Sequence, residues 1–262
     1  MPEGDTVFAA AARLRRALDG QVLTYCQFRT PTLATVDYTG HTVTAVRSRG
    51  KHLLIDVVDP EGVAVPSIHS HLKMEGAWHV HPLGTRWRRP GHHARVVLRT
   101  QKSEAVGFEL GILELLADPD AALAYLGPDL LADDWDAAEA VRRIEARPST
   151  PIGLALLDQR LMAGVGNVYR CEACFLRGVL PTTPVADVDI PAMVDLCRRL
   201  LWNNRIRTAR STTGQTAPNA RTWVYGRRGQ LCRRCATPIR RDRLGDADDG
   251  DRVIYFCPTC QR

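Results

Sequence analysis

The spacing of apolar residues predicts a helix followed by a β-domain in the first half of the chain. Residues 5–18 (DTVFAAAARLRRAL) carry apolar side chains at helical spacing, with Asp5 or Thr6 as the cap and Gly20 just beyond the end. Between residues 21 and 115 the apolar runs become short and strand-like, and Gly, Pro and Asp turns separate them. The clearest runs are VLTYCQF, TVTAVRSR, HLLIDVV, GAWHVH and ARVVLRT. This pattern predicts one amphipathic helix and an antiparallel β-sandwich.

The second half of the chain changes to helical spacing. Residues 117–134 are acidic and contain proline, which is typical of an interdomain linker with a short helix or two. From 135 to 205 the helical runs are WDAAEAVRRIEAR, PIGLALLD, NVYRCEACFLRG and IPAMVDLCRRLLWNNRI. The predicted fold class is therefore α+β. The sequence contains no internal repeat.

Two Cys-x-x-Cys pairs near the end of the chain predict a metal site. Cys232 and Cys235 are separated by 21 residues from Cys257 and Cys260, a spacing that offers four thiolates to a tetrahedral Zn²⁺ on a small β-hairpin. Four protein ligands leave no open coordination position, so we expect one structural zinc ion and no hydrolytic one. Disulfides are the alternative. However, AAAA at 9–12 followed at once by arginines is the wrong order for a secretory signal, which favours a reducing cytoplasm and a metal.

Charge and composition narrow the class of partner. Lys and Arg number 35 against 29 Asp and Glu, which gives a formal charge of +6 and a pI near 9.0. The acids concentrate at 117–139 and 242–251, so the positive excess is larger elsewhere, and arginines surround the four cysteines. Such a surface suits a polyanion. No apolar run approaches 18 residues, so the sequence predicts no membrane span.

Two short stretches carry candidate chemistry. Gly164 and Gly166 end one helical run and allow a tight turn, and Asn167 is placed to cap the next helix, so backbone amides and the Asn side chain would face one point and hold a phosphate. An ordinary helical turn in a bundle is the alternative. At the other end, removal of Met1 would leave Pro2 as a secondary amine. Such an amine attacks an electrophilic carbon and forms an iminium, and Glu3 stands beside it to donate a proton.

Six motifs in this order resemble one family, the DNA glycosylase/lyases typified by formamidopyrimidine-DNA glycosylase and endonuclease VIII. The motifs are PEG at 2–4, GKHLL at 50–54, SHLKMEG at 70–76, LLDQRLMAGVGNVYRCEACF at 156–175, VYGRRGQLCRRC at 224–235 and RVIYFCPTCQ at 252–261. The resemblance covers the whole chain and is closer to the endonuclease VIII side. It implies a catalytic β-sandwich domain over 1–116, a linker over 117–134, a helix-two-turn-helix domain over 135–224 and a zinc finger over 225–262.

The resemblance also implies a reaction. Pro2 resembles the family nucleophile, which attacks C1′ of a damaged nucleotide and displaces the base, and Glu3 resembles the proton donor that opens the sugar. The resulting iminium acidifies the C2′ proton, so elimination expels the 3′ phosphate and a second elimination can expel the 5′ phosphate. The implied substrates are oxidised bases in DNA, with pyrimidines favoured on the endonuclease VIII side.

The resemblance assigns DNA contacts to separate elements. Lys51 matches an essential hairpin lysine, Asn167 a helix-two-turn-helix asparagine, and Arg252 the zinc-finger arginine; together they would hold the backbone around an everted nucleotide. Glu172 corresponds to a carboxylate near the sugar, with a helix-surface role as the alternative. Met74 matches a wedge that fills the space left by the flipped base, with a core position as the alternative.

The chain departs from the family at three places. Relatives of the formamidopyrimidine type carry an Arg-Phe-Gly loop for the opposite strand, whereas this chain reads Val106-Gly107-Phe108-Glu109-Leu110; Phe108 is a second wedge candidate. A second N-terminal acid is absent at Thr6, and Asp5 is the candidate to replace it. Residues 205–223 suggest a loop over the everted base or a phosphate contact.

The sequence therefore predicts a monomeric, cytoplasmic base-excision repair enzyme, a bifunctional DNA glycosylase and abasic-site lyase. Its partner would be damaged DNA, its one cofactor would be structural Zn²⁺, and neither a membrane nor a small-molecule cofactor would take part. The alternative is a non-catalytic, zinc-dependent DNA-binding or regulatory protein on the same scaffold. Cys171 and Cys174 lack a second pair and are expected to be buried thiols, and the alternating histidines at 69–81 are expected to be satisfied polar groups or DNA contacts.

Overall fold

The computed structural model describes residues 2–245 and 252–262. The chain forms two compact units. The first contains Pro2 and Thr6–Tyr125, and the second contains Glu3–Asp5 and Leu126–Arg262. Helix α1 (Gly4–Leu18) therefore begins with residues of the second unit and continues in the first. The division into four segments drawn from the family resemblance is finer than this and stays a prediction.

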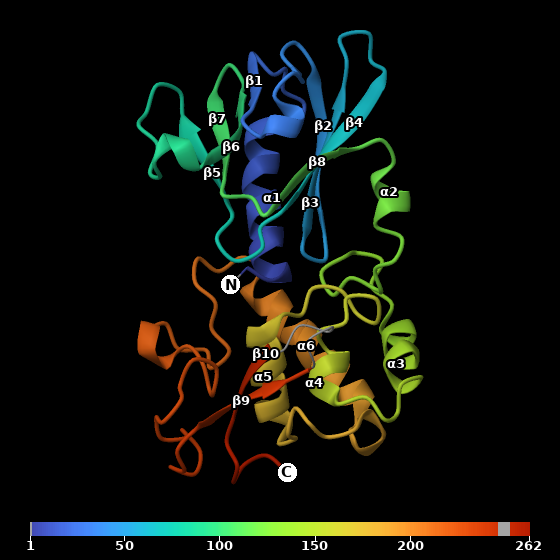
Figure 1. The fold of residues 1–262 in the computed structure, drawn as a ribbon, viewed down its shortest axis with the longest axis vertical. Helices are drawn as coiled ribbons and strands as arrows, with labels where there is room; N and C mark the ends of the chain where they lie inside the picture. Colours follow the sequence, from blue (N-terminus) through green and yellow to red (C-terminus); the bar gives the residue numbers. More distant parts are fainter. Residues whose placement is uncertain (1, 246–251) are drawn as a thin grey trace. The chain divides into compact units, whose positions relative to one another are not determined.

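The first unit holds two four-stranded antiparallel sheets, in the orders β1-β6-β7-β5 and β2-β3-β4-β8 (Figure 1). The strands are β1 (Tyr25–Phe28), β2 (Thr42–Arg49), β3 (His52–Val58), β4 (Ala64–His71), β5 (Ala77–Pro82), β6 (Ala94–Arg99), β7 (Ser103–Phe108) and β8 (Ile112–Leu116). Short 3₁₀ turns, η1 (Pro31–Leu33) and η2 (Gly91–His93), lie in the connections, and helix α2 (Pro119–Ala122) follows β8.

Helix α1 contributes one apolar face to the core of the first unit. Its buried side chains recur at helical spacing and pack with buried residues of both sheets. These side chains are Val7, Ala10, Ala11, Leu14 and Leu18. The predicted α+β class, with a helix and an antiparallel sandwich, is confirmed.

The second unit is helical, with a two-stranded hairpin. Its helices are α3 (Ala137–Glu145), α4 (Ile152–Ala155), α5 (Asn167–Arg177) and α6 (Ile190–Asn204), with 3₁₀ turns η3 (Val185–Asp187) and η4 (Pro218–Ala220). The hairpin strands β9 (Arg240–Leu244) and β10 (Arg252–Phe256) pair antiparallel. One apolar cluster joins the hairpin side of this unit to α5 through Val224, Ile239 and Ile254 packed with Cys171 and Phe175. The small hairpin therefore shares a core with α5.

Within the described ranges 2–245 and 252–262, no helix has the length and apolar character needed to cross a bilayer.

Candidate active site

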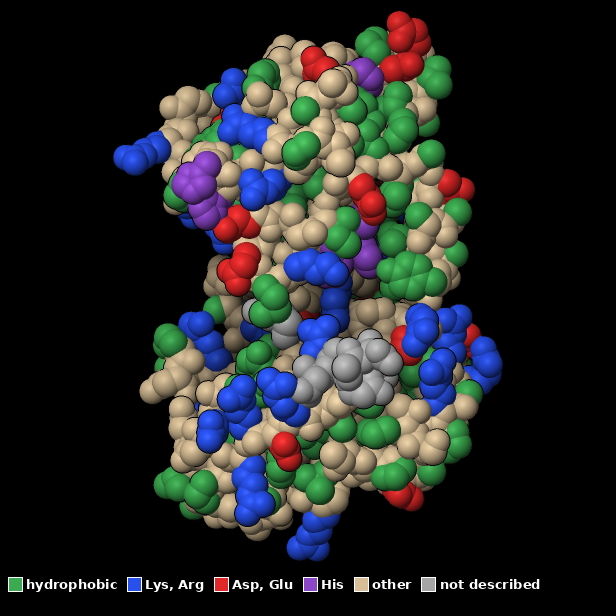
Figure 2. All heavy atoms as spheres, viewed as in Figure 1, with side chains coloured by type: hydrophobic (Ala, Val, Ile, Leu, Met, Phe, Trp, Pro, Cys, Tyr) green, Lys and Arg blue, Asp and Glu red, His purple; other side chains and the backbone are tan. Residues whose placement is uncertain are grey.

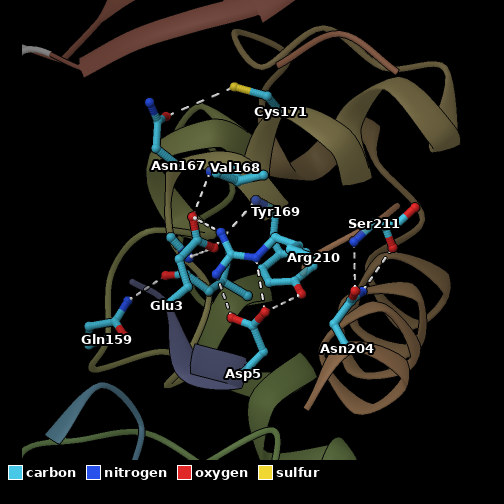
Figure 3. Close-up of polar contacts among 12 residues, drawn as sticks. Glu3, Asp5, Gln159, Asn167, Val168, Tyr169, Cys171, Asn204, Arg210 and Ser211 are labelled. Atoms are coloured by element: carbon cyan, nitrogen blue, oxygen red, sulfur yellow. Dashed lines mark hydrogen bonds and ion pairs between the residues drawn. The ribbon is translucent and has the colours of Figure 1, made fainter. Parts of the chain in front are cut away.

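Glu3 lies at the beginning of α5, although its hydrogen-bond partners there are 163 to 166 positions away in the sequence. Its side chain is fully buried. One carboxylate oxygen accepts a hydrogen bond from the amide of Val168 (2.7 Å), and the other accepts from Gly166 (2.8 Å) and from Tyr169 (3.4 Å) (Figure 3). The first amides of a helix have no partner inside it and carry the positive end of its dipole. The carboxylate of Glu3 therefore caps α5 and is held in one position.

The capping of α5 corrects one prediction about Asn167. Asn167 is the first helical residue, and Gly166 precedes it without any capping hydrogen bond from its own side chain. The sequence placed Asn167 as the cap because Asn is a frequent capping residue. The cap instead comes from Glu3, so the amides at this turn hold a carboxylate of the chain itself.

The two glycines of the turn are needed for close approach. A Cβ on Gly166 would lie 2.5 Å from Cδ of Glu3. Gly164 has φ +115°, a left-handed conformation that favours glycine. Its carbonyl accepts from the amide of Gly4 at 2.9 Å, and a Cβ on Gly4 would lie only 3.0 Å from Cα of Gly164. The spacing Gly-x-Gly therefore allows the residues after Pro2 to pack directly on the α5 turn.

A buried charged cluster flanks Glu3. Arg210 donates to both carboxylate oxygens of Asp5, at 2.5 and 2.9 Å, and its guanidinium lies 3.7 Å from Glu3. The Tyr169 hydroxyl also donates to Asp5, at 2.9 Å (Figure 3). Burial lowers the pKa of Arg210, but Glu3 and Asp5 outweigh burial and raise it overall. Burial, followed by the charge of Asp5, raises the pKa of Tyr169. Asp5, the candidate for the acid missing at Thr6, is thus tied to the same cation that faces Glu3.

Glu172 holds the segment after α6 against α5. Its fully buried carboxylate accepts from the backbone amides at 223, 224 and 225, at 2.8, 2.9 and 2.8 Å, and from the hydroxyl of Thr212. Burial raises the pKa of Glu172, while these donors act to lower it. All four donors are protein groups, and the residue is 0% exposed. The geometry therefore supports an internal anchor in place of the predicted DNA contact and of the alternative helix-surface role.

Asn167 and Arg252 lie near each other at the start of β10. The Asn167 amide donates to the carbonyl of Val253 at 2.8 Å. Arg170, which is fully buried, donates to the carbonyl of Asn167's side chain and to the same backbone carbonyl of Val253 at 3.2 Å. Burial, with a contribution from the charge of Arg252, lowers the pKa of Arg170. The side chain of Arg252 is exposed. Asn167 and Arg252, two of the predicted phosphate contacts, therefore both lie at the start of strand β10.

The four predicted metal ligands form one cluster. The sulfur atoms of Cys232, Cys235, Cys257 and Cys260 all lie within 4.8 Å of one another. The Cys232–Cys260 and Cys235–Cys257 sulfur distances are 3.8 and 3.5 Å. Tetrahedral zinc with Zn–S bonds of about 2.3 Å requires sulfur atoms about 3.8 Å apart, so the cluster fits a four-thiolate zinc site. The four cysteines could therefore bind one metal ion, as the sequence predicts. That the ion is zinc stays a proposal.

Exposed arginines surround the metal cluster. Figure 2 shows Lys and Arg side chains gathered on the visible face of the second unit. The exposed arginines from this region are Arg228, Arg233, Arg234, Arg240, Arg241, Arg243, Arg252 and Arg262. Arg227 is the exception, because it is buried and donates to the backbone carbonyl of Leu231 at 2.8 Å. The predicted positive surface is thus present, except that Arg227 is buried and stabilises the backbone near Leu231.

In the first unit, Lys51 occupies the turn between β2 and β3. Gly50 before it has φ +58°. Close to this turn, His71 at the end of β4 accepts a hydrogen bond at Nδ1 from the backbone amide of Lys73 (3.0 Å). An amide can only donate, so Nδ1 of His71 is unprotonated and its proton is on Nε2. Burial, and then the charges of Lys73 and Lys51, lower the pKa of His71 to about 4.

A hydrogen-bonded chain lies behind this turn. Nδ1 of His52 lies 2.8 Å from Nε2 of His69, and Nδ1 of His69 lies 2.8 Å from the carboxylate of Glu114. At the other end, the Tyr125 hydroxyl lies 3.2 Å from Nε2 of His52. Burial, followed by the charge of His71, lowers the pKa of His52 to about 3. His69 is thus a satisfied polar group, as the sequence led us to expect, and with His52 it fixes the first residue of β3 next to Lys51. The same expectation is wrong for His79 and His81, because Nδ1 of His79 and Nε2 of His81 are buried without a hydrogen-bond partner among the described residues.

The structure separates the two wedge candidates. Phe108 is fully buried and packs edge-on against Trp87, with the ring centroids 5.7 Å apart, and against His79, at 5.3 Å. Met74 is 57% exposed and lies in the turn after β4. Only Met74 of this pair has a side chain available for insertion.

The structure groups the predicted site residues by unit. Pro2, Lys51 and Met74 belong to the first, and the remaining ones belong to the second: Glu3, Asn167, Glu172, Arg252 and the four cysteines. Arg210 was missed as a site residue, and its sequence signal was the polar, arginine-bearing loop at 205–223. His71 is one of the histidines at alternate strand positions, which the sequence left as satisfied polar groups or DNA contacts.

Comparison with known proteins agrees with this arrangement. Models of the formamidopyrimidine-DNA glycosylase N-terminal domain and H2TH domain match residues 1–109 and 126–213. The chain is 52% identical over 265 residues to the DNA-(apurinic or apyrimidinic site) lyase Nei2 of Mycolicibacterium smegmatis, covering 100% of this chain and 99% of that protein. It is 50% identical over 269 residues to endonuclease 8 2 of Mycobacterium tuberculosis, covering both completely. A crystal structure of the Lactococcus lactis Fpg with abasic-site DNA has the same fold, with a TM-score of 0.80, 22% identity and complete coverage of both chains.

Proposed function

This chain belongs to the formamidopyrimidine-DNA glycosylase and endonuclease VIII family, and on that premise we propose that it is a bifunctional DNA glycosylase and abasic-site lyase that uses Pro2 as nucleophile. The observation that carries the proposal is the placement of Glu3. Its carboxylate is buried and fixed by three amides of the α5 turn, directly beside Pro2 in the sequence. A carboxyl group in a fixed position next to a secondary amine is the pair that imine chemistry on a sugar requires.

In the proposed reaction the Pro2 nitrogen attacks C1′ of the damaged nucleotide, and the bond from C1′ to the base breaks. The base leaves with the bonding electrons and takes up the proton that the Pro2 nitrogen loses. Glu3 supplies a proton to the sugar ring oxygen, which opens the ring and leaves an iminium between Pro2 and C1′. The iminium withdraws electrons, so a C2′ proton is lost and the 3′ phosphate departs; a second elimination releases the 5′ phosphate. Water then hydrolyses the iminium, which releases the sugar remnant as an aldehyde and returns the Pro2 nitrogen to its amine form. No step draws on the zinc ion.

The proposed contacts with the DNA backbone come from both units. Lys51 supplies a cation on the β2–β3 turn, and His71 supplies a neutral N–H donor whose tautomer is fixed by the amide of Lys73. Asn167 and Arg252 supply the contacts near the zinc finger. Phosphate oxygens accept such donors, and each neutralised phosphate makes binding more sensitive to salt. Met74 would enter the stack where the nucleotide leaves it.

We further propose that the four-cysteine cluster holds one Zn²⁺ and that the preferred lesions are oxidised pyrimidines. The first rests on sulfur distances that fit tetrahedral thiolate coordination. The second rests on the similarity to proteins named endonuclease 8. The zinc would hold β10, and with it Arg252, against α5, because a hairpin of this size has little core of its own. A monomer in the cytoplasm, bound to damaged DNA, is the proposed working state.

A strand-cleavage assay separates this proposal from a non-catalytic DNA-binding protein. A duplex with a single oxidised pyrimidine should be cleaved at that site, and the undamaged duplex should not be. Glu3→Gln keeps the shape of the side chain, so it should sharply reduce base release while retaining DNA binding. Binding of damaged DNA without cleavage by the unaltered protein would instead support the non-catalytic alternative.

A further inference from the structure

A basic cavity lies in the first unit beside the last turns of α1. Its volume is about 450 Å³, and its lining comes from α1, the segment just after this helix, the edge strand β5 and the turn between β6 and β7. The Ser103 hydroxyl donates to the carbonyl of Ala17 at 3.4 Å, so the turn is joined to the helix where both line the cavity. The other lining residues are Arg13, Arg16, Gln21, Val80 and Lys102.

The three cations of this cavity form no ion pair with a carboxylate within residues 2–245 and 252–262. The acids that follow them closely in the sequence already have other partners. Asp19 pairs with Arg15 at 3.9 Å, and Glu104 pairs with Arg99. No acidic residue lines the cavity itself. The free protein therefore carries an uncompensated positive charge at this point of its surface.

The effect of this missing compensation is visible at Arg13. Burial, and then the charge of Arg16, lower the pKa of Arg13. Burial acts to lower the pKa of Arg47 as well, but Asp120 and Asp56 raise it overall. Like charges three or four residues apart on a helix repel each other. An anion bound between Arg13 and Arg16 would remove this repulsion.

We propose that the cavity binds a phosphate-bearing nucleotide, either free or within a nucleic-acid strand. A phosphate monoester carries about −1.5 to −2 charges at neutral pH, and guanidinium groups bind its oxygens in pairs. Sites for small ligands have volumes of roughly 300–1,000 Å³, so this cavity has room for one nucleotide. The side chain of Val80 is 37% exposed and offers an apolar contact to a sugar or base, and the Gln21 amide offers a donor and an acceptor.

The cavity is separate from the DNA contacts proposed for this unit. Thr6 and Arg16 are ten residues apart on α1, which at about 1.5 Å per residue is about 15 Å along the helix. Lys51 and Met74 lie on other turns and do not line the cavity. A nucleotide bound here would therefore leave the proposed reaction site open, and the inference does not depend on the proposed reaction.

The test follows backbone amide resonances of the isotope-labelled, full-length protein by NMR during titration with thymidine 5′-monophosphate at constant ionic strength. Resonances of Gln21, Val80, Lys102 and Ser103 report on the cavity, and that of Lys51 reports separately on the proposed DNA contact. We expect saturable shifts of the cavity resonances. Thymidine, which lacks the phosphate, should produce none.

Arg13→Ala should weaken this binding about tenfold, because hydrogen bonds to a charged group are lost. Arg15→Ala is the matched control. It removes the same charge from the same helix, but Arg15 donates to the carbonyl of Val46, at 2.9 and 3.1 Å, and does not line the cavity. Its binding midpoint should equal that of the unaltered protein.

The salt dependence of duplex binding distinguishes the two sources of the nucleotide. If a strand supplies the phosphate, Arg13→Ala should reduce the slope of log affinity against log salt by about 0.9. If a free nucleotide supplies it, the slope should be unchanged. Neither measurement requires cleavage, so a protein that cleaves no lesion still tests the cavity.

Four results would overturn the inference: no saturable shift of the cavity resonances, equal shifts with thymidine, an unchanged midpoint in Arg13→Ala, or the same loss in Arg15→Ala. If Arg13→Ala does not fold, Arg16→Glu is the second variant. It places an acid three residues after Arg13, which favours the helix and fills the cavity with a negative charge. Undiminished binding in Arg16→Glu would also overturn the inference.

Discussion

Replacing Gly166 with alanine tests whether the fixed position of Glu3 matters for catalysis. The new Cβ would lie 2.5 Å from Cδ of Glu3, whereas ordinary contacts begin near 3.4 Å, so one of the two must move by about 0.9 Å (3.4 − 2.5). Gly166 has φ −122°, which alanine adopts without strain, so the backbone tolerates the change. Displacement of a catalytic group by about 1 Å typically costs about 100-fold in rate. We therefore expect kcat for abasic-site cleavage to fall about 100-fold.

The assay for Gly166→Ala is single-turnover cleavage of a single-stranded abasic-site oligonucleotide, with DNA affinity and thermal unfolding measured in parallel. Affinity should change little, because the altered contact is internal to the protein. Gly91→Ala is the matched control, since its Cβ would meet only the Trp87 ring at 3.7 Å. A Gly166→Ala protein that folds and cleaves at the rate of the unaltered protein would show that the position of Glu3 does not set the rate.

Four further predictions follow from the structure. Arg210→Ala leaves two buried carboxylates without their cation and should lower the free energy of unfolding in urea by about 3–5 kcal/mol; a loss under 1 kcal/mol would contradict this account. Phe108→Ala should cost about 3–5 kcal/mol of stability, whereas Met74→Ala should cost little stability but slow excision from duplex DNA; the reverse pattern would exchange their roles. The pKa values of His52 and His71, about 3 and 4 in the folded chain, lie below the ordinary value, so the folded state binds fewer protons and stability is lost as pH falls from about 6.5 towards 4; replacing both with glutamine should flatten this dependence in thermal unfolding. Chelation of the metal should abolish binding to abasic-site DNA and leave the melting of the β-sandwich in place, and unchanged binding after verified metal removal would contradict the role of the cluster.

The regular elements were predictable where a single segment carried its own signal. The runs TVTAVRSR and HLLIDVV correspond to β2 and β3 over their full lengths, because β-branched residues and flanking turns mark both ends. Strand β4 contains Pro66, which removes a backbone donor and weakens the strand pattern. It is tolerated because the β3–β4 register shifts between Ile55 and Val57. Neither the bulge nor the pairing partner can be seen in one segment alone.

The catalytic residues were predictable by motif, but their surroundings were not. Nothing near Pro2 in the sequence indicates that Glu3 accepts hydrogen bonds from amides more than 160 residues away. The Gly-x-Gly spacing before Asn167 predicted a tight turn. That the carboxylate of Glu3 binds the amides of this turn could be seen only in the tertiary structure. The same holds for Glu172, whose helical position was correct while its burial beneath the segment 223–225 depended on how the later chain folds.

The most direct test of the account is covalent trapping with borohydride on abasic-site DNA, followed by mass mapping of the joined peptide. Reduction of an iminium fixes the DNA to the attacking nitrogen, so we expect one adduct, on the nitrogen of Pro2. We expect none when Met1 is retained or when a blocking group occupies that nitrogen. An adduct on any other residue, or strand cleavage without a trapped adduct, would contradict Pro2 as the nucleophile.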